Sequence, residues 1–201
     1  MAYERLLMGA TAVGVKVKSG VVVAAEKRIS YGGFILSHRG KKVFRIGDRM
    51  VMAAAGLFAD MQTLSRIVSA EIRLREVITS TPMRVRAAAK LLSALLYSYK
   101  FFPFYSEILF AGIDEEGPHL FVLDPIGSII EDRYAAVGTG ASIAIGIIET
   151  EYEETMGLEK AVELVTKAIK AASSRDAVSG DGIDIAVVSS QGVEEKFVPL
   201  A

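Results

Sequence analysis

The 201-residue chain contains no cysteine and only two histidines, and these shortages exclude several kinds of chemistry. Without cysteine the chain forms no disulfides, no thiolate metal sites and no cysteine nucleophile. His38 and His119 are far apart in the sequence, so no zinc site is expected. We predict that both histidines lie on the surface or in loops, and we predict no metal ion or other cofactor.

Clusters of basic residues and long apolar segments are also missing. Lys and Arg total 23 against 24 Asp and Glu, which gives a formal net charge of -1, and no basic block occurs. A nucleic-acid partner is not expected, because phosphate binding needs clustered Lys and Arg. The longest apolar runs, such as residues 50–58, fall far short of the roughly 20 residues of a membrane helix. Residues 1–9 do not read as a secretory signal, so we expect no membrane association and a cytoplasmic location.

Apolar residues are plentiful, and they follow the periods of strands and helices. Hydrophobic residues make up 51% of the chain, a composition typical of a packed globular protein. Residues 13–17 alternate apolar and other side chains, which predicts a strand buried on one face. Residues 21–25 are continuously apolar, which predicts a partner strand covered on both faces. No linker or repeat occurs, so we expect one domain.

The order of the predicted elements defines a fold class. Further strands are expected near residues 41–46, 50–55, 107–113, 119–123, 128–135, 183–188 and 192–199. Amphipathic helices are expected from residue 59, over 81–99, from 138 to about 153, and over 158–173. Residues 31–40 are expected to form a polar loop. Strands grouped with paired helices, without βαβ alternation, predict an α+β protein, a four-layer αββα sandwich of two sheets covered by helices.

Several short motifs, in order along nearly the whole chain, resemble β-type subunits of the 20S proteasome core, most closely the archaeal ones. They are Ala12-Val13-Gly14 and the segments 22–28, 41–44, 54–57, 112–114, 138–140, 175–180 and 183–184. The resemblance implies an N-terminal-nucleophile hydrolase fold, a pro-segment over 1–9 before a single domain over 10–201, and no cofactor. It also implies stacked seven-membered rings with other β-type subunits, including a catalytic paralogue, and with α-type subunits. Unfolded polypeptide is the implied substrate, and a regulatory ATPase is an indirect partner.

The resemblance also assigns roles to individual residues. In active members a threonine exposed by removal of the pro-segment supplies both the nucleophile and, through its free amine, the base. The implied environment of the nucleophile consists of Glu26, Lys42, Thr139, Asp176 and Ser179. The implied oxyanion donor is Gly56. The implied walls of the substrate pocket are Ile29, Ala54 and Phe58.

The residue expected to be the nucleophile is replaced. Active family members read Gly-Thr-Thr-Thr-Val-Gly, and aligning Val13-Gly14 with the last two residues puts Gly9 at the pro-segment cleavage position. Ala10 then occupies the nucleophile position. Alanine has no hydroxyl, so the chain would neither remove its own pro-segment nor cleave a peptide. It would be a natural non-catalytic subunit or an enzyme whose threonine was replaced.

Two alternatives remain open from the sequence. In the first, Thr11 is the N-terminal nucleophile of a working threonine endopeptidase after removal of residues 1–10. Thr11 lies one residue nearer Gly14 than the family pattern allows, and a one-residue slip on a strand reverses the direction of the side chain. In the second, the chain is an N-terminal-nucleophile relative outside the proteasome, such as a simpler homomeric protease.

Overall fold

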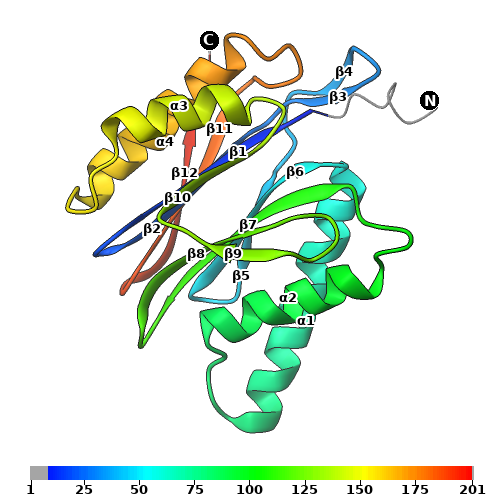
Figure 1. Ribbon diagram of the computed structural model, residues 1–201, viewed down its shortest axis with the longest axis vertical. Helices are drawn as coiled ribbons and strands as arrows, with labels where there is room; N and C mark the ends of the chain where they lie inside the picture. Colours follow the sequence, from blue (N-terminus) through cyan, green and yellow to red (C-terminus); the bar gives the residue numbers. More distant parts are fainter. Residues whose placement is uncertain (1–8, 201) are drawn as a thin grey trace.

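Two five-stranded antiparallel sheets form the two inner layers of the molecule (Figure 1). The computed structural model describes residues 9–200. The first sheet has the spatial order β10 (Tyr134–Gly138), β1 (Thr11–Val17), β2 (Gly20–Glu26), β11 (Ile183–Ser189) and β12 (Gly192–Val198). The second has the order β5 (Val43–Ile46), β6 (Met50–Gly56), β7 (Ser106–Asp114), β8 (Gly117–Leu123) and β9 (Ile129–Glu131).

Two pairs of helices form the outer layers. The helices α3 (Ala141–Glu151) and α4 (Leu158–Ser173) pack on the first sheet, and α1 (Phe58–Thr79) and α2 (Val85–Ser98) pack on the second (Figure 1). The predicted α+β architecture of two helix-covered sheets is confirmed. None of the four helices within residues 9–200 combines the length and apolarity that a bilayer-spanning helix requires.

Side-chain alternation along β1 divides the interior into two cores. Ala10 and Ala12 belong to the core that includes both sheets, whereas Val13 and Val15 belong to the core beneath α3 and α4. The continuously apolar strand β2 contributes to both cores, as its sequence predicts. Because successive residues of a strand point to opposite faces, position 11 faces the helix layer when position 10 faces the other sheet.

The predicted loop at residues 31–40 is wrong in part, because it contains a two-stranded hairpin, β3 (Ile29–Tyr31) and β4 (Phe34–Ser37). The turn between them has positive φ angles at Gly32 (55°) and Gly33 (84°), which glycine adopts without strain. Phe34 and Leu36 are exposed, so the segment lacks the alternation of buried and exposed residues that identifies most strands.

Two other parts of the chain differ from the sequence-based expectation. Residues 128–135 form two strands in different sheets, β9 and β10, because the chain turns at Asp132, whose carboxylate accepts a hydrogen bond from the backbone of Arg133. Helix α2 begins at Val85 and not near residue 81. The Val85 N–H is satisfied by the distant Asp114 carboxylate at 2.8 Å, a contact that local sequence does not reveal.

His119 lies in a strand and is buried, so the prediction of a surface or loop position is wrong for this residue. It is 5% exposed in β8, between the carboxylates of Glu131 (Nδ1 to Oε1, 2.8 Å) and Asp114 (Nε2 to Oδ1, 3.3 Å). His38 follows β4 and its side chain is 65% exposed, as expected. The predicted pro-segment lies outside the described residues except for Gly9.

Candidate active site around position 10

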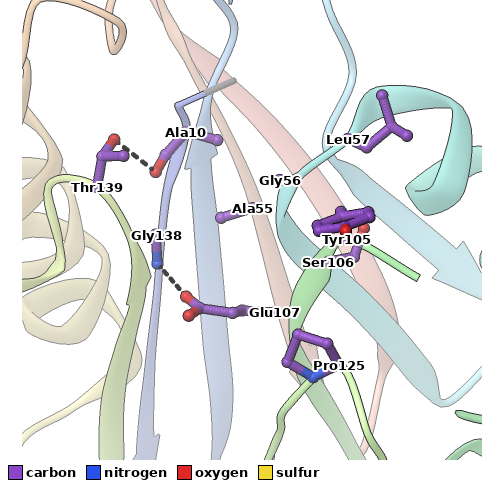
Figure 2. Close-up of a pocket in the computed structure, with 10 residues that line it drawn as sticks. All are labelled: Ala10, Ala55, Gly56, Leu57, Tyr105, Ser106, Glu107, Pro125, Gly138 and Thr139. Atoms are coloured by element: carbon purple, nitrogen blue, oxygen red, sulfur yellow. Dashed lines mark hydrogen bonds between the residues drawn. The ribbon is translucent and has the colours of Figure 1, made fainter. Parts of the chain in front are cut away.

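Ala10 precedes β1 at the end of the space between the two sheets. It is 1% exposed and lines a pocket of about 520 Å³ with Gly56, Gly138 and Thr139 (Figure 2). Its carbonyl oxygen accepts a hydrogen bond from the Thr139 N–H at 2.9 Å. Position 10 is therefore fixed on the wall of the pocket, and its side chain is a methyl group.

The Thr11 side chain is fully buried on the opposite side of the strand, and Thr11 does not line the pocket. Its Oγ1 lies 2.9 Å from Ser179 Oγ. A Cβ atom added to Gly140 would lie 2.3 Å from Thr11 Oγ1, which shows how closely the α3 N-terminus covers this hydroxyl. The hydroxyl of Thr11 is thus enclosed beneath the helix layer.

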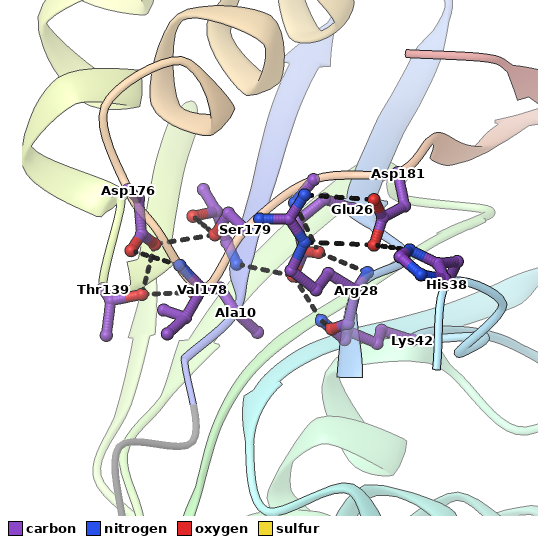
Figure 3. Close-up of polar contacts among 12 residues, drawn as sticks. Ala10, Glu26, Arg28, His38, Lys42, Thr139, Asp176, Val178, Ser179 and Asp181 are labelled. Carbon is purple, nitrogen blue, oxygen red and sulfur yellow. Dashed lines mark hydrogen bonds and ion pairs between the residues drawn. The ribbon is translucent and has the colours of Figure 1, made fainter. Parts of the chain in front are cut away.

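A buried ion pair, Glu26 with Lys42, lies beside the peptide bond between residues 10 and 11. The Lys42 ammonium donates to Glu26 Oε1 and to the Arg28 carbonyl oxygen, the latter at 2.6 Å (Figure 3). The Thr11 N–H donates to the same Glu26 oxygen at 3.3 Å. The second carboxylate oxygen accepts from the backbone N–H groups of Arg28 (2.6 Å) and Gly180 (3.0 Å). Glu26 therefore links the ammonium to the start of β1.

Burial shifts the proton affinities of this pair toward each other. Loss of solvation raises the pKa of the Glu26 carboxyl, against the attraction of Lys42. The same loss lowers the pKa of the Lys42 amine, against the attraction of Glu26. Both shifts have the same cause, the burial of a charged group, and in each case the charge of the partner opposes the shift.

A second polar group, on the other side of the same peptide unit, is centred on Asp176. Its Oδ2 accepts hydrogen bonds from Thr139 Oγ1 and from Ser179 Oγ, the latter at 2.7 Å (Figure 3). Because Ser179 gives its single proton to Asp176, the Thr11 hydroxyl is the donor in the contact between Thr11 and Ser179. The structure therefore brings together the predicted residues Glu26, Lys42, Thr139, Asp176 and Ser179 around positions 10 and 11.

Two glycines of the site are required by their surroundings. A Cβ on Gly9 would lie 1.7 Å from Val178 Cγ2, so no side chain fits immediately before Ala10. Gly56 has a φ of 127°, and its Cβ would lie 2.1 Å from the Tyr105 carbonyl oxygen. Substitution at either position would force backbone or a neighbouring side chain to move.

The three residues predicted as walls of the substrate pocket do not line the pocket beside Ala10. Ile29 begins β3, and its side chain packs against Gly40, where an added Cβ atom would lie 2.2 Å from Ile29 Cδ1. Ala54 is fully buried in β6, and Phe58, the first residue of α1, packs partly buried on the core. Their role in binding substrate stays a prediction.

Sequence reasoning missed residues that the fold brings to the site from a distance. Glu107 lines the pocket and accepts a hydrogen bond from the Gly138 N–H at 2.7 Å (Figure 2). Arg28 forms a two-point pair with Asp181 (both contacts 3.0 Å), and His38 Nδ1 lies 2.8 Å from the same carboxylate. No local motif marks these contacts, because the partners are separated by between 31 and 153 residues.

Within residues 9–200, no group of three or more His, Asp or Glu side chains is arranged to hold a metal ion.

Comparison with known proteins defines the family. The family model described as "Proteasome subunit" matches residues 7–188. The chain is 53% identical to "Proteasome subunit beta 2" of Thermofilum pendens over 191 residues, covering 95% of this chain and 94% of that protein. It is 55% identical to "Proteasome subunit beta 1" of Ignicoccus hospitalis over 184 residues, covering 92% of each chain. It is 52% identical to "Proteasome subunit beta 2" of Pyrobaculum calidifontis over 197 residues, covering 98% and 97%.

The chain belongs to the proteasome subunit family. The curated relatives are β-type subunits, and the similarity to them over nearly the full length makes this chain a β-type subunit of the 20S core. Membership of this family implies a place in proteolysis and assembly with other proteasome subunits.

Proposed function

We propose that this chain, with a single domain over residues 10–201, is a non-catalytic β-type subunit that shapes the degradation chamber of the proteasome. One observation carries the proposal: the side chain at position 10, the nucleophile position by resemblance, is the methyl group of Ala10 on the pocket wall. A methyl group has no lone pair with which to attack a carbonyl carbon. Neither removal of the pro-segment after Gly9 nor peptide cleavage would then occur at this subunit.

The surrounding groups suit a threonine at position 10. Lys42, held by Glu26, would place positive charge beside the attacking oxygen, and the Asp176 group with Ser179 and Thr139 would orient the free amine that acts as base. The backbone N–H of Gly56 would stabilise the oxyanion, in a conformation that leaves no room for a side chain. The site in this proposal is complete except for one hydroxyl group.

The alternative, an active threonine endopeptidase that uses Thr11, would require rearrangement. The Thr11 hydroxyl would have to leave Ser179 and cross to the other face of β1. The Thr11 N–H contact with Glu26 would also be altered by the new chain terminus. The described register, Thr11 opposite Gly138 and Ala12 opposite Ala25, favours the non-catalytic subunit.

The intact mass of the chain recovered from assembled particles tests the proposal. A mass that includes residues 1–9 is expected. A mass corresponding to a start at Thr11, together with peptide cleavage that is abolished by Thr11→Ala, would establish the alternative and overturn the proposal.

We further propose that the chain occupies stacked seven-membered rings in the cytoplasm. Its proposed partners are other β-type subunits, one of them catalytic, and α-type subunits, with a regulatory ATPase acting indirectly and unfolded polypeptide as substrate. Support comes from large exposed apolar residues in the connection between α2 and β7, where Phe101 is 82% and Phe102 is 88% exposed. Such a cluster is more typical of an interface than of a monomer surface. Electron microscopy of the particle, with its ring number and layers, distinguishes this assembly from a simpler homomeric protease.

A further inference from the structure

The pocket beside Ala10 has mostly apolar walls and one carboxylate. It measures about 520 Å³, within the range of sites that bind small ligands. The residues that line it are Ala10, Ala55, Gly56, Leu57, Tyr105, Ser106, Glu107, Pro125, Gly138 and Thr139. Among residues 9–200, Glu107 is, apart from Tyr105, the only lining residue with an ionisable side chain, and no Lys or Arg of that range lines the pocket. The pocket therefore offers apolar contact together with a single negative charge.

Glu107 is anchored through its Oε2 atom. The residue is exposed at the start of β7, and Oε2 accepts the Gly138 N–H at 2.7 Å (Figure 2). Within residues 9–200 that is the only hydrogen bond of this carboxylate, so Oε1 retains its capacity to accept one from a ligand. The bond to Gly138 fixes the direction of the side chain, so a ligand would meet a carboxylate that is already positioned.

A second polar side chain, that of Ser106, belongs to the same wall. Ser106 lines the pocket and is 1% exposed, and its hydroxyl makes no hydrogen bond within the described residues. A buried hydroxyl without a partner is unfavourable. Because the Oγ atom itself is covered by protein, a ligand in the pocket would not contact this hydroxyl, and Glu107 remains the polar group that a ligand can reach.

We propose that this pocket binds a basic side chain of an extended polypeptide, with Glu107 as the residue that selects it. The aliphatic part of Lys or Arg packs against apolar walls such as Leu57 and Pro125, while its charged end reaches a carboxylate. This inference rests on the proposed function, because it takes unfolded polypeptide as the ligand. The site lies among residues other than Ile29, Ala54 and Phe58, so it is a separate determinant of what the subunit holds.

The absence of a hydroxyl at position 10 makes binding measurable without cleavage. The assembled particle containing the full chain is titrated against two fluorescein-labelled hexapeptides that differ only in one arginine or norleucine, and anisotropy gives the two affinities. Any catalytic subunits in the particle are first blocked with a covalent inhibitor of threonine nucleophiles. The arginine peptide is expected to bind about threefold to fivefold more tightly at low salt, as an accessible ion pair allows. The advantage is expected to shrink in high salt.

Glu107→Gln is the decisive variant, because glutamine keeps an oxygen for the Gly138 N–H and loses only the charge. It is expected to abolish the preference for arginine and leave the norleucine peptide unaffected. Glu163→Gln, an exposed carboxylate on α4, is the matched control and is expected to keep the preference. Equal affinities for the two peptides, or a preference that survives Glu107→Gln, would overturn the inference. The intact mass of the same particles separately reports whether the proposed function holds.

Discussion

The side chain at position 10 determines whether the proposed active site contains a nucleophile. We predict that Ala10→Thr leads to cleavage after Gly9 in assembled particles, because Glu26, Lys42 and Asp176 already surround that position. The new hydroxyl would attack the carbonyl carbon of Gly9, and an ester would replace the peptide bond before hydrolysis. Intact mass is expected to show the loss of residues 1–9.

The matched control for this substitution is Ala10→Val, since valine has the shape of threonine without the oxygen. It is expected to remain uncut. When Thr11→Ala is combined with Ala10→Thr, cleavage after Gly9 is still expected, since the Thr11 hydroxyl lies on the other face of β1. If the Ala10→Thr chain stays intact in assembled rings, the surrounding residues do not form a competent site.

The buried ion pair gives a second prediction at the scale of the residue. Side-chain exposure is 2% for Lys42 and 0% for Glu26, so removing one partner leaves an uncompensated charge. Lys42→Met is expected to lower the free energy of unfolding by about 3–5 kcal/mol, measured by urea denaturation. Adding Glu26→Gln is expected to recover part of that loss.

Lys41→Met serves as the control for this measurement. Lys41 is the neighbouring residue, but its ion pair with Glu195 is exposed, with side-chain exposures of 52% and 43%. Its loss is expected to cost at most about 1 kcal/mol. Equal losses of unfolding free energy for Lys41→Met and Lys42→Met would show that burial does not make the Glu26–Lys42 pair more stabilising than the exposed pair.

At the scale of elements, a partly buried clamp joins the β3–β4 hairpin to the loop before β11. Hydrogen bonds from Arg28 lower the pKa of the Asp181 carboxyl, and His38 acts in the same direction. Because the folded-state pKa is depressed, the clamp stabilises the fold above the unfolded value near roughly 3.9 and is lost as pH falls through the lower folded value. We predict that Asp181→Asn lowers the stability of the protein at pH 7. The stability of the variant is expected to fall less steeply than that of the wild type as the pH is lowered.

Thermal unfolding between pH 3 and pH 7 measures this effect. The expected cost at pH 7 is about 1–3 kcal/mol, with wild type and variant converging toward acid pH. Asp48→Asn is the control, because the Asp48 side chain is 93% exposed and its one ion pair within residues 9–200 is with Arg45. Parallel pH curves for wild type and Asp181→Asn would contradict the assignment.

The elements also show what sequence can predict. The alternation of side chains along β1 and the uninterrupted apolar run of β2 arise because sheets and helices cover these strands. The two patterns therefore predicted the sandwich, and the alternation also predicted that residues 10 and 11 point in opposite directions. The β3–β4 hairpin was missed because its apolar residues are exposed. The position of His119 was missed because its burial depends on Asp114 and Glu131, which reach it from β7 and β9. These contacts form only once β8 pairs with its two neighbouring strands, so the sequence of β8 alone does not reveal them.

For the whole molecule, the exposed aromatic segment between α2 and β7 gives a prediction about assembly. Phe101 and Phe102 are both more than four-fifths exposed, so replacing them with serine removes little buried area from the isolated chain. The double variant Phe101→Ser/Phe102→Ser is expected to keep its thermal stability as a free subunit but to assemble poorly, because apolar surface of this kind is buried when subunits meet.

Size-exclusion chromatography with light scattering, together with thermal unfolding of the free subunit, separates these two effects. Ile130→Ser is the control, since Ile130 is 59% exposed on β9 and lies outside the aromatic segment. It is expected to assemble as the wild type does. Full-size particles from the double variant would place the interface elsewhere on the surface, whereas a loss of stability in the free subunit would show that the two phenylalanines support the fold itself. A double variant that folds normally but fails to assemble would show that this segment contributes to the subunit interface.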